Sequence, residues 1–329
     1  MSRRQLQVYG ALLAFAASGG GCYPAPQRTP PPATAPASQV ALSGASVLVG
    51  AGDIARCDAN GDELTAALVD SILKADSVAK VSDAVFTLGD NAYSSGSTGQ
   101  WTNCFTPSWG DPKKSIMKNI RPSPGNHEYY TAGADPYYAY FGKAAGPPGK
   151  GYYSYDLGEW HAVVLNSETI INSSFNEAAR KEQIDWLQAD LKANTKECTL
   201  AYWHHSRFSS GPHGSDVKLA PVFQILYENG VDLVLTGHDH HYERFAPMTA
   251  HGVVDTLHGI PSYVIGTGGA ELRGMQLPLA QNSLKRVEGY YGILLLTLGG
   301  KEFRSAFIST DGYVWDPAGG KCHGAPAKP

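Results

Sequence analysis

Apolar and polar residues follow two different patterns along most of the chain. Short continuous apolar runs, the pattern of buried strands, occur at residues 46–49, 83–88, 160–165, 199–203 and 231–235. Between them, apolar residues spaced three and four positions apart predict amphipathic helices at 63–78, 177–191 and 217–227. Alternation of strands and helices is typical of layered α/β domains, and this is the fold class that we expect.

The last part of the chain has a different pattern. Apolar runs at 262–265, 291–296 and 303–308 predict further strands, and no strong helical pattern accompanies them. We therefore expect these C-terminal strands to form a second sheet that packs on the first.

The first 22 residues have the pattern of an export signal. Arg3 and Arg4 precede an apolar stretch at 8–17, and small residues lead up to Cys22. This stretch is too short to span a bilayer as a helix. The Ser-Arg-Arg-x-Leu opening resembles a twin-arginine signal, and the small residues before Cys22 resemble a lipoprotein cleavage site. We therefore expect a bacterial protein that is exported. Its expected location is the periplasm, the outer membrane, where a lipid on Cys22 would anchor it, or the extracellular space.

Residues 23–45 are rich in Pro, Ala, Ser and Thr. Such a segment cannot bury a core and predicts an extended linker, so that residues 46–329 form the folded domain. This domain contains four cysteines, at positions 57, 104, 198 and 322. An even number in an exported protein indicates two disulfides. Of the three connectivities, we favour Cys57 with Cys104 and Cys198 with Cys322.

Composition narrows the class of partner. The chain has 329 residues, of which 43% are hydrophobic and 17% charged, enough for a sizeable core. Its 26 basic and 30 acidic residues give a net charge of -4, and no dense Lys/Arg run is present. A nucleic-acid or anionic-membrane surface is therefore not expected as the main partner. The 37 glycines and 21 prolines indicate many ordered loops, where binding and catalytic sites are usually built.

Polar residues that could bind a ligand follow four of the predicted strands, and one further group of them lies in a loop. The segments are Gly52-Asp53, Gly89-Asp90 with Tyr93, Gly125-Asn126-His127-Glu128, His204-His205 and Gly237-His238-Asp239-His240. Ligands of open α/β sheets bind at the carboxyl ends of strands, so we expect these side chains to converge.

The types of these residues indicate metal binding. Carboxylates, an amide, imidazoles and a phenol, with no thiolate, suit iron, zinc, manganese or similar ions. One ion cannot use them all. With one bridging carboxylate, seven groups can hold two ions about 3.5–4 Å apart, the arrangement used to hydrolyse phosphoesters.

This ordered set of motifs resembles the calcineurin-like metallophosphoesterase superfamily and, within it, the purple acid phosphatases. Ala55 stands where many other members of the superfamily have a histidine, and Tyr93 stands where the purple phosphatases have an iron-binding tyrosinate. The resemblance spans residues 53–244. It implies that residues 46–329 form the catalytic domain, an α/β/β/α sandwich of two packed mixed sheets flanked by helices.

The resemblance also implies a division of the ligands between two ions. Fe3+ would be bound by Asp53, Asp90, Tyr93 and His240. A second ion, Fe2+, Zn2+ or Mn2+, would be bound by Asp90, Asn126, His204 and His238, so that Asp90 bridges. Because Ser206 occupies a position where family members often have proline, His205 stays an alternative to His204.

The implied activity is hydrolysis of small phosphate monoesters by a metal-activated hydroxide. The resemblance assigns phosphate binding to Asn126, His127 and His213, and protonation of the leaving group to His127 or His213. Two alternatives stay open: a phosphodiesterase acting on nucleotides or phospholipid head groups at the same site, and a surface lipoprotein that binds metal or phosphate without turnover. A serine hydrolase is not expected, since the chain has no Gly-x-Ser-x-Gly motif.

Overall fold

The structure is a computed structural model that describes residues 42, 45–76, 83–172, 174–175 and 177–326. The predicted export signal at 1–22, with Cys22, lies outside the described residues. So does the predicted linker at 23–45, apart from residues 42 and 45. Among the residues that are described, none of the helices combines the length and the apolarity needed to cross a membrane.

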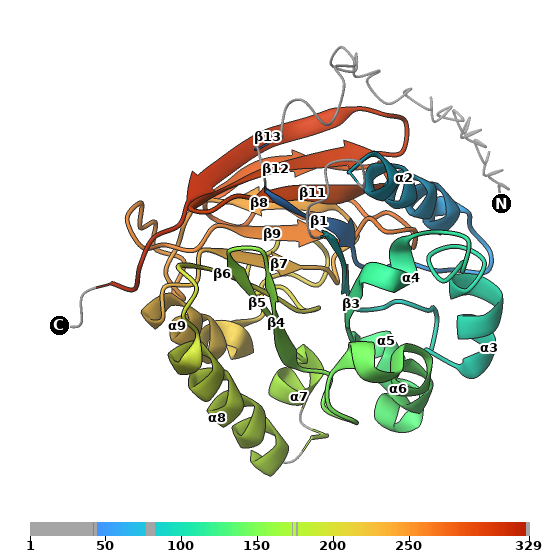
Figure 1. Ribbon diagram of the computed structural model, residues 1–329, viewed down its shortest axis with the longest axis horizontal. Coiled ribbons are helices and arrows are strands. Elements are labelled where there is room, and N and C mark those ends of the chain that lie inside the picture. The colour runs from blue at the N-terminus through green and yellow to red at the C-terminus, as the bar shows by residue number, and fades with distance from the viewer. Residues whose placement is uncertain (1–41, 43–44, 77–82, 173, 176, 327–329) are drawn as a thin grey trace, which may run out of the picture. The chain divides into compact units, whose positions relative to one another are not determined.

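Two mixed sheets form the centre of the domain (Figure 1). The first is six-stranded, in the order β13-β12-β11-β1-β2-β3. Its strands are β1 (Ser46–Ala51), β2 (Asp83–Leu88), β3 (Ile120–Ser123), β11 (Gly292–Leu298), β12 (Glu302–Ser309) and β13 (Val314–Lys321). Strands β1, β2 and β3 run parallel, so their carboxyl ends lie at one edge of this sheet.

The second sheet is seven-stranded, in the order β10-β8-β9-β7-β6-β5-β4. Its strands are β4 (Tyr153–Leu157), β5 (Trp160–Val164), β6 (Cys198–Tyr202), β7 (Leu233–Thr236), β8 (Tyr242–Phe245), β9 (Ser262–Ile265) and β10 (Ser283–Val287). Strands β5, β6, β7 and β9 are parallel to their neighbours in this series.

Helices cover the outer faces of the sheets and fill the connections. The α-helices are α2 (Gly61–Asp76), α3 (Thr98–Gln100), α4 (Ile116–Asn119), α5 (Asn126–Tyr129), α6 (Asp135–Phe141), α7 (Ser167–Ile171), α8 (Glu177–Ala193) and α9 (Ala220–Glu228). A π-helix η1 (Trp101–Phe105) and three 3-10 helices, η2 (Ala132–Ala134), η3 (Gly142–Ala145) and η4 (Val217–Leu219), complete the set in the described ranges.

The side chains of the second sheet separate into two apolar clusters. On β5, Ala162 and Val164 belong to the core that contains residues of both sheets and of α2. Val163 lies in a second cluster, together with Leu187 of α8 and Phe223 of α9. Neighbouring residues of a strand point to opposite faces, so this sheet is buried on both sides. The layers are helix, sheet, sheet and helix, which confirms the predicted α/β/β/α sandwich.

Most predicted elements are present, but one expectation about the sheets was wrong. The C-terminal strands do not form the second sheet by themselves. Strand β11 pairs antiparallel with β1, and β12 pairs with β11, so both extend the first sheet, whereas β9 lies in the second. A hydrophobic pattern predicts which strands are buried, but it carries no information on which distant strand is the neighbour.

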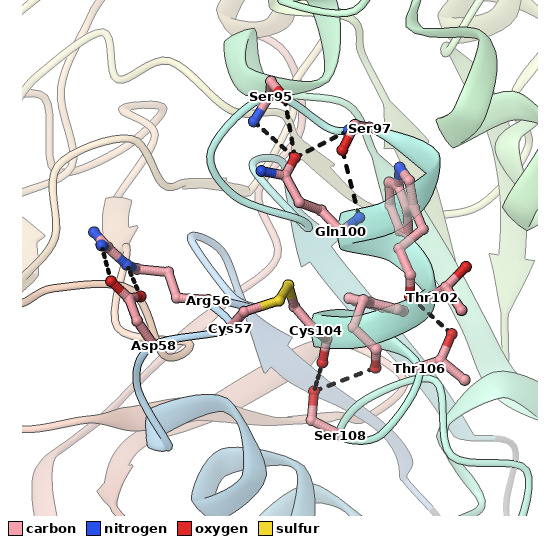
Figure 2. The surroundings of a disulfide bond; sticks show 12 residues. Arg56, Cys57, Asp58, Ser95, Ser97, Gln100, Thr102, Cys104, Thr106 and Ser108 are labelled. Atoms are coloured by element: carbon pink, nitrogen blue, oxygen red, sulfur yellow. Dashed lines mark hydrogen bonds and ion pairs between the residues drawn. A yellow bond between two sulfur atoms is a disulfide. The ribbon is translucent and has the colours of Figure 1, made fainter.

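Both predicted disulfides are confirmed. Cys57 is bonded to Cys104, which attaches the loop after β1 to η1 (Figure 2). Cys198, the first residue of β6, is bonded to Cys322, which directly follows β13. The second bond therefore joins one sheet to the other.

Candidate metal centre

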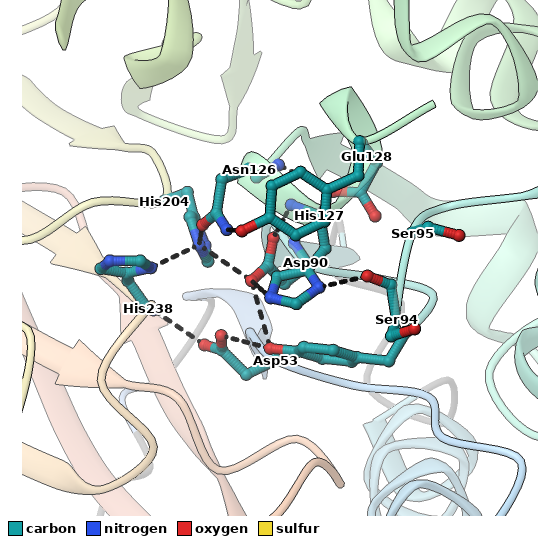
Figure 3. A network of polar contacts seen from close by, with 12 residues as sticks. Asp53, Asp90, Ser94, Ser95, Asn126, His127, Glu128, His204 and His238 are labelled. Carbon is teal, nitrogen blue, oxygen red and sulfur yellow. Dashed lines mark hydrogen bonds and ion pairs between the residues drawn. The ribbon is translucent and has the colours of Figure 1, made fainter. Parts of the chain in front are cut away.

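All seven predicted ligands lie together at the carboxyl ends of strands from both sheets. Figure 3 labels five of them, Asp53, Asp90, Asn126, His204 and His238. Asp53 follows β1, Asp90 follows β2 and Asn126 begins α5 after β3. From the second sheet, His204 follows β6, and His238 and His240 follow β7. The site therefore spans the edges of both sheets, and neither sheet could build it alone.

The backbone bends sharply where the ligands leave the strands. Asp53, Asp90 and His238 have positive φ angles of 59°, 48° and 71°. Such angles are uncommon outside glycine and cluster at functional sites. Gly89 has a φ of 79°, and a Cβ atom there would lie 2.7 Å from the Gly125 backbone and from Cγ of His204. Only glycine lets the loop after β2 approach the other ligands so closely.

One group of ligand atoms surrounds Nε2 of His240. This nitrogen lies 3.1 Å from the Tyr93 hydroxyl and 3.3 Å from Oδ1 of Asp53. Nδ1 of His240 donates to the Glu271 carbonyl at 2.5 Å, so Nε2 carries the lone pair of the neutral ring. These are the residues expected at the Fe3+ position, apart from Asp90.

A second group surrounds Nε2 of His204. It lies 3.2 Å from Oδ2 of Asp90, 3.0 Å from Oδ1 of Asn126 and 3.0 Å from Nδ1 of His238. Nδ1 of His204 donates to the Leu88 carbonyl at 2.6 Å, which again leaves Nε2 without a proton in the neutral ring. These are the residues expected at the second metal position.

Asp90 is common to both groups. Its Oδ2 lies 3.2 Å from the Tyr93 hydroxyl and 3.2 Å from Nε2 of His204. The other oxygen, Oδ1, accepts the backbone N–H of His127 at 2.8 Å, which fixes the orientation of the carboxylate. This placement is the one that a bridging ligand requires.

The chemistry of this donor set fits cations. Carboxylate, amide and imidazole atoms with lone pairs face one another at about hydrogen-bond distance, and such an arrangement is favourable only around positive charge. His204 responds accordingly. Burial lowers the pKa of His204, but the Asp90 carboxylate outweighs it and raises this pKa to about 10. Two groups of described residues here, one of them Asp53, Asp90 and His204, could hold a metal ion.

Tyr93 is held as a phenol in the absence of a cation. Burial, together with the charges of Asp53 and Asp90, raises its pKa well above the ordinary value. A bound cation reverses the effect of those charges on the phenol. Tyr93 therefore requires a strongly Lewis-acidic ion to become a tyrosinate.

The two predicted phosphate-binding histidines differ in their contacts. Nδ1 of His127 donates to the Ser94 carbonyl at 2.6 Å, and its Nε2 lies 3.7 Å from Oδ2 of Asp90. The ring of His213 packs against that of His238, with 4.1 Å between centroids and 32° between the ring planes. Nε2 of His213 lies 2.7 Å from Nη1 of Arg273. A guanidinium can only donate, so this Nε2 carries a lone pair.

The geometry favours His204 over His205 as the ligand. Nδ1 of His205 is hydrogen-bonded to the Ser167 hydroxyl at 2.8 Å, and its Nε2 lies 3.5 Å from Glu168. The centroid of the His205 ring still lies 4.3 Å from that of His238, so His205 packs against a predicted ligand. Only His204 points toward Asp90.

Two buried carboxylates that hold the ligand loops were not assigned a role from the sequence. Glu128 accepts backbone N–H groups of Gly125, Asp90 and Asn91 at 2.7, 2.9 and 2.8 Å. Burial and the charge of Asp90 raise the pKa of Glu128 to about 8, although these hydrogen bonds oppose the shift. Glu128 belongs to the Gly-Asn-His-Glu motif, and this motif was the signal that could have found it.

The other carboxylate is Asp239, which is buried beside the loop after β6. It accepts the backbone N–H groups of His213 at 2.9 Å and Gly214 at 3.2 Å, and the Ser209 hydroxyl at 2.5 Å. Asp239 therefore fixes the loop that carries His213.

Comparison with known proteins agrees with this geometry. A model of the family described as calcineurin-like phosphoesterase matches residues 48–242. Purple acid phosphatase 18 of Arabidopsis thaliana is 34% identical over 99 residues, which are 28% of this chain and 21% of that protein. Acid phosphatase type 7 of Homo sapiens is 26% identical over 216 residues, 57% of this chain and 47% of that protein.

The fold has a similar match. A purple acid phosphatase isolated from yellow lupin seeds (Lupinus luteus) superposes with a TM-score of 0.68 at 20% identity, over 84% of this chain and 54% of that one. The chain thus spans between about a fifth and a half of the curated relatives named above. The curated relatives that the chain matches include purple acid phosphatases, and the chain belongs to the calcineurin-like phosphoesterase family.

Proposed function

We propose that this protein is an exported phosphatase that hydrolyses small phosphate monoesters at a dinuclear metal centre. The observation that carries the proposal is the position of Asp90, whose Oδ2 lies 3.2 Å from both the Tyr93 hydroxyl and Nε2 of His204. A carboxylate oxygen shared between two ligand groups favours two adjacent ions over one. The phenol of Tyr93 favours Fe3+ in its group, and the amide and histidines favour Fe2+, Zn2+ or Mn2+ in the other.

Two bound ions would supply Lewis acidity, polarising the phosphoryl group and lowering the pKa of water. The chain itself positions these groups and handles the proton of the leaving oxygen. We assign that proton to Nε2 of His127. Its Nδ1 donates to the Ser94 carbonyl at 2.6 Å, which fixes the ring and leaves Nε2 to carry the transferred proton. Such general acid catalysis contributes roughly 10²–10⁴ in rate.

His213 is less suited to this proton transfer. Its Nε2 accepts from Arg273 at 2.7 Å and cannot carry a proton while that contact exists. Its ring packs against that of His238 and would limit how the substrate approaches the second ligand group.

Export is supported by the disulfides together with the N-terminal sequence. Disulfide bonds persist in oxidising compartments and are rare in the cytosol of mesophiles. The two bonds, Cys57–Cys104 and Cys198–Cys322, agree with the signal-like pattern at 1–22. We propose a periplasmic, surface-anchored or extracellular location, and mass analysis of the mature protein would reveal cleavage or a lipid on Cys22.

The proposal is tested with purified protein and two substrates. We expect about two metal ions per chain, as the bridging arrangement requires, and a higher kcat/KM for p-nitrophenyl phosphate than for bis(p-nitrophenyl) phosphate. Asp90→Asn should lose metal and activity together. Asp185→Asn, an exposed position on α8, is the matched control and should keep both. A higher kcat/KM for the diester would instead identify a phosphodiesterase. Metal binding without turnover of either substrate would contradict both enzymes.

A further inference from the structure

An arginine from a loop outside the predicted ligand motifs reaches the candidate metal centre. Arg273 lies between β9 and β10. Its backbone N–H donates to the His240 carbonyl at 3.0 Å, and Nδ1 of His240 donates to the carbonyl of Glu271 at 2.5 Å. Two main-chain hydrogen bonds thus attach this loop to a ligand of the first group.

The side chain of Arg273 then reaches the other ligand group. Nη1 donates to Nε2 of His213 at 2.7 Å, and the His213 ring packs against that of His238. The backbone of Arg273 is therefore hydrogen-bonded to His240, and its guanidinium contacts His213, which packs against His238. The side chain is 31% exposed, so solvent and solutes can contact it.

One carboxylate, that of Glu271, holds the Arg273 guanidinium from the other side. Nη2 of Arg273 donates to Oε1 of Glu271 at 2.8 Å. Oε2 of Glu271 accepts from Nη1 of Arg56 at 2.5 Å. Although burial opposes it, the two arginines lower the pKa of Glu271 to about 2, so this carboxylate is charged at neutral pH. Arg56 in turn is fixed beside the Cys57–Cys104 disulfide (Figure 2).

The two arginines differ in the donors that they have left. Arg56 is bidentate to Asp58, with Nε and Nη2 both at 2.8 Å, and its Nη1 is used by Glu271. Arg273 uses one N–H of Nη1 and one of Nη2, and its Nε has no partner among the residues that the structure describes. A guanidinium has five N–H donors, so Arg273 has three available for an incoming oxyanion.

We propose that Arg273 binds a non-bridging oxygen of the substrate's phosphoryl group, and that Glu271 is the positioning residue that holds the guanidinium over the site. This inference rests on the proposed phosphatase function and adds a protein group that recognises the phosphoryl oxygens. Arginine suits this role because its planar fork matches phosphate geometry and stays charged at all working pH values. Arg56 serves as part of the support, through Asp58 and Glu271.

Binding of inorganic phosphate to the metal-loaded protein, measured by calorimetry, tests the inference directly. In Arg273→Ala we expect phosphate affinity, and kcat/KM for p-nitrophenyl phosphate, to fall about 10- to 100-fold, the range for hydrogen bonds to charged groups. Metal content should not change, because the two hydrogen bonds to His240 come from the main chain. Arg273→Lys should recover only part of the loss, since lysine lacks the fork. Arg304→Ala, at an exposed position on β12, is the matched control.

The role of Glu271 is tested by a double-mutant cycle. Glu271→Gln should weaken phosphate binding in the wild-type background and have little further effect in Arg273→Ala, because both changes remove the same contact. Unchanged phosphate affinity in both Arg273→Ala and Arg273→Lys overturns the inference, whatever the activity. If wild-type protein hydrolyses no monoester but its phosphate affinity still depends on Arg273, the proposed function fails, and Arg273 is a phosphate-binding residue without the assigned substrate.

Discussion

The hydroxyl of Tyr93 donates a hydrogen bond of 2.9 Å to Oδ1 of Asp53, between two buried carboxylates. The same oxygen lies 3.2 Å from Oδ2 of Asp90. Both carboxylates disfavour a negative phenolate, so the phenol keeps its proton until a cation compensates the charge. The state of Tyr93 should therefore report directly on the metal in the first ligand group.

Replacement of Tyr93 by phenylalanine should abolish the colour of the iron-loaded protein. A tyrosinate bound to Fe3+ gives a visible charge-transfer band, and Tyr93→Phe removes the oxygen that makes it. We expect the wild type to show the band, and the variant to lack it while keeping its far-UV circular dichroism. Absorption spectra with metal analysis of the same samples provide the measurement.

The control for this experiment is Tyr313→Phe, a half-buried tyrosine near the start of β13. It should keep the band. A coloured Tyr93→Phe protein would contradict the assignment of Tyr93 as the iron ligand. A colourless wild type that is active and free of iron would remove Fe3+ from the proposal but leave the ligand set intact.

Tyr130→Phe should weaken the second metal position selectively. Nδ2 of Asn126 donates to the Tyr130 hydroxyl at 3.1 Å, which turns Oδ1 of Asn126 toward His204. Phenylalanine keeps the ring beside His127 but loses this acceptor, so the amide can rotate. Loss of such a supporting contact typically costs 10- to 100-fold in metal affinity, and we expect a fall of about tenfold.

Chelator competition measures this effect for each ion separately. The ion in the Tyr93 group should be retained at the same chelator concentration as in the wild type, since Tyr130 makes no contact there among the described residues. If Tyr130→Phe lost both ions equally, or retained both as the wild type does, Tyr130 would have no role in orienting Asn126.

Six of the seven ligands follow a strand that the sequence predicts. Asn126 follows β3 (Ile120–Ser123), which was not predicted, and only the Gly-Asn-His-Glu motif pointed to it. The segment 83–88 has the length and composition of a buried strand, and Asp90 comes directly after it. In an α/β layer, such positions converge whatever the exact order of the strands. The resemblance to the purple acid phosphatases then supplied the complete set of seven, so the wrong assignment of strands to sheets did not affect it.

Arg273 and Glu271 could not be found in this way. They lie in a loop between β9 and β10 that contains no metal-binding motif, and they reach the site only because β9 lies beside β7 in the second sheet. That pairing brings together residues far apart in the sequence. A lone Arg in such a loop resembles any surface cation until the neighbouring strands are known.

Stability should depend on pH through His161. Its Nδ1 lies 2.9 Å from Oδ1 of Asp156, and its Nε2 lies 2.9 Å from Oδ2 of Asp190 on α8. Burial lowers the pKa of His161, but the two carboxylates outweigh it and raise this pKa above its ordinary value. A raised histidine pKa stabilises the folded state fully below the unfolded pKa of about 6.5, and this contribution is lost as pH rises through the folded pKa.

Urea denaturation at several pH values measures this effect. His161→Gln should lose about 1–3 kcal/mol of unfolding free energy below pH ~6.5 and less above it. The larger share should come from Asp190, because Asp156 is 56% exposed and its contribution is screened. His251→Gln, at an exposed loop position, should show neither change. A difference between wild type and His161→Gln that grows with pH would contradict the charged state of this histidine.

The two disulfides should differ in what they contribute to stability. Cys198 and Cys322 are 124 positions apart, whereas Cys57 and Cys104 are 47 apart. In the chain-entropy model, the longer loop loses more freedom when it is closed, by about 1 kcal/mol for this difference in length, within a total of roughly 2–5 kcal/mol per bond. Guanidinium denaturation of Cys198→Ser/Cys322→Ser should therefore show a greater loss than that of Cys57→Ser/Cys104→Ser. The reverse order would indicate that the loop carrying Arg56 depends on its disulfide for native packing as well as for chain entropy.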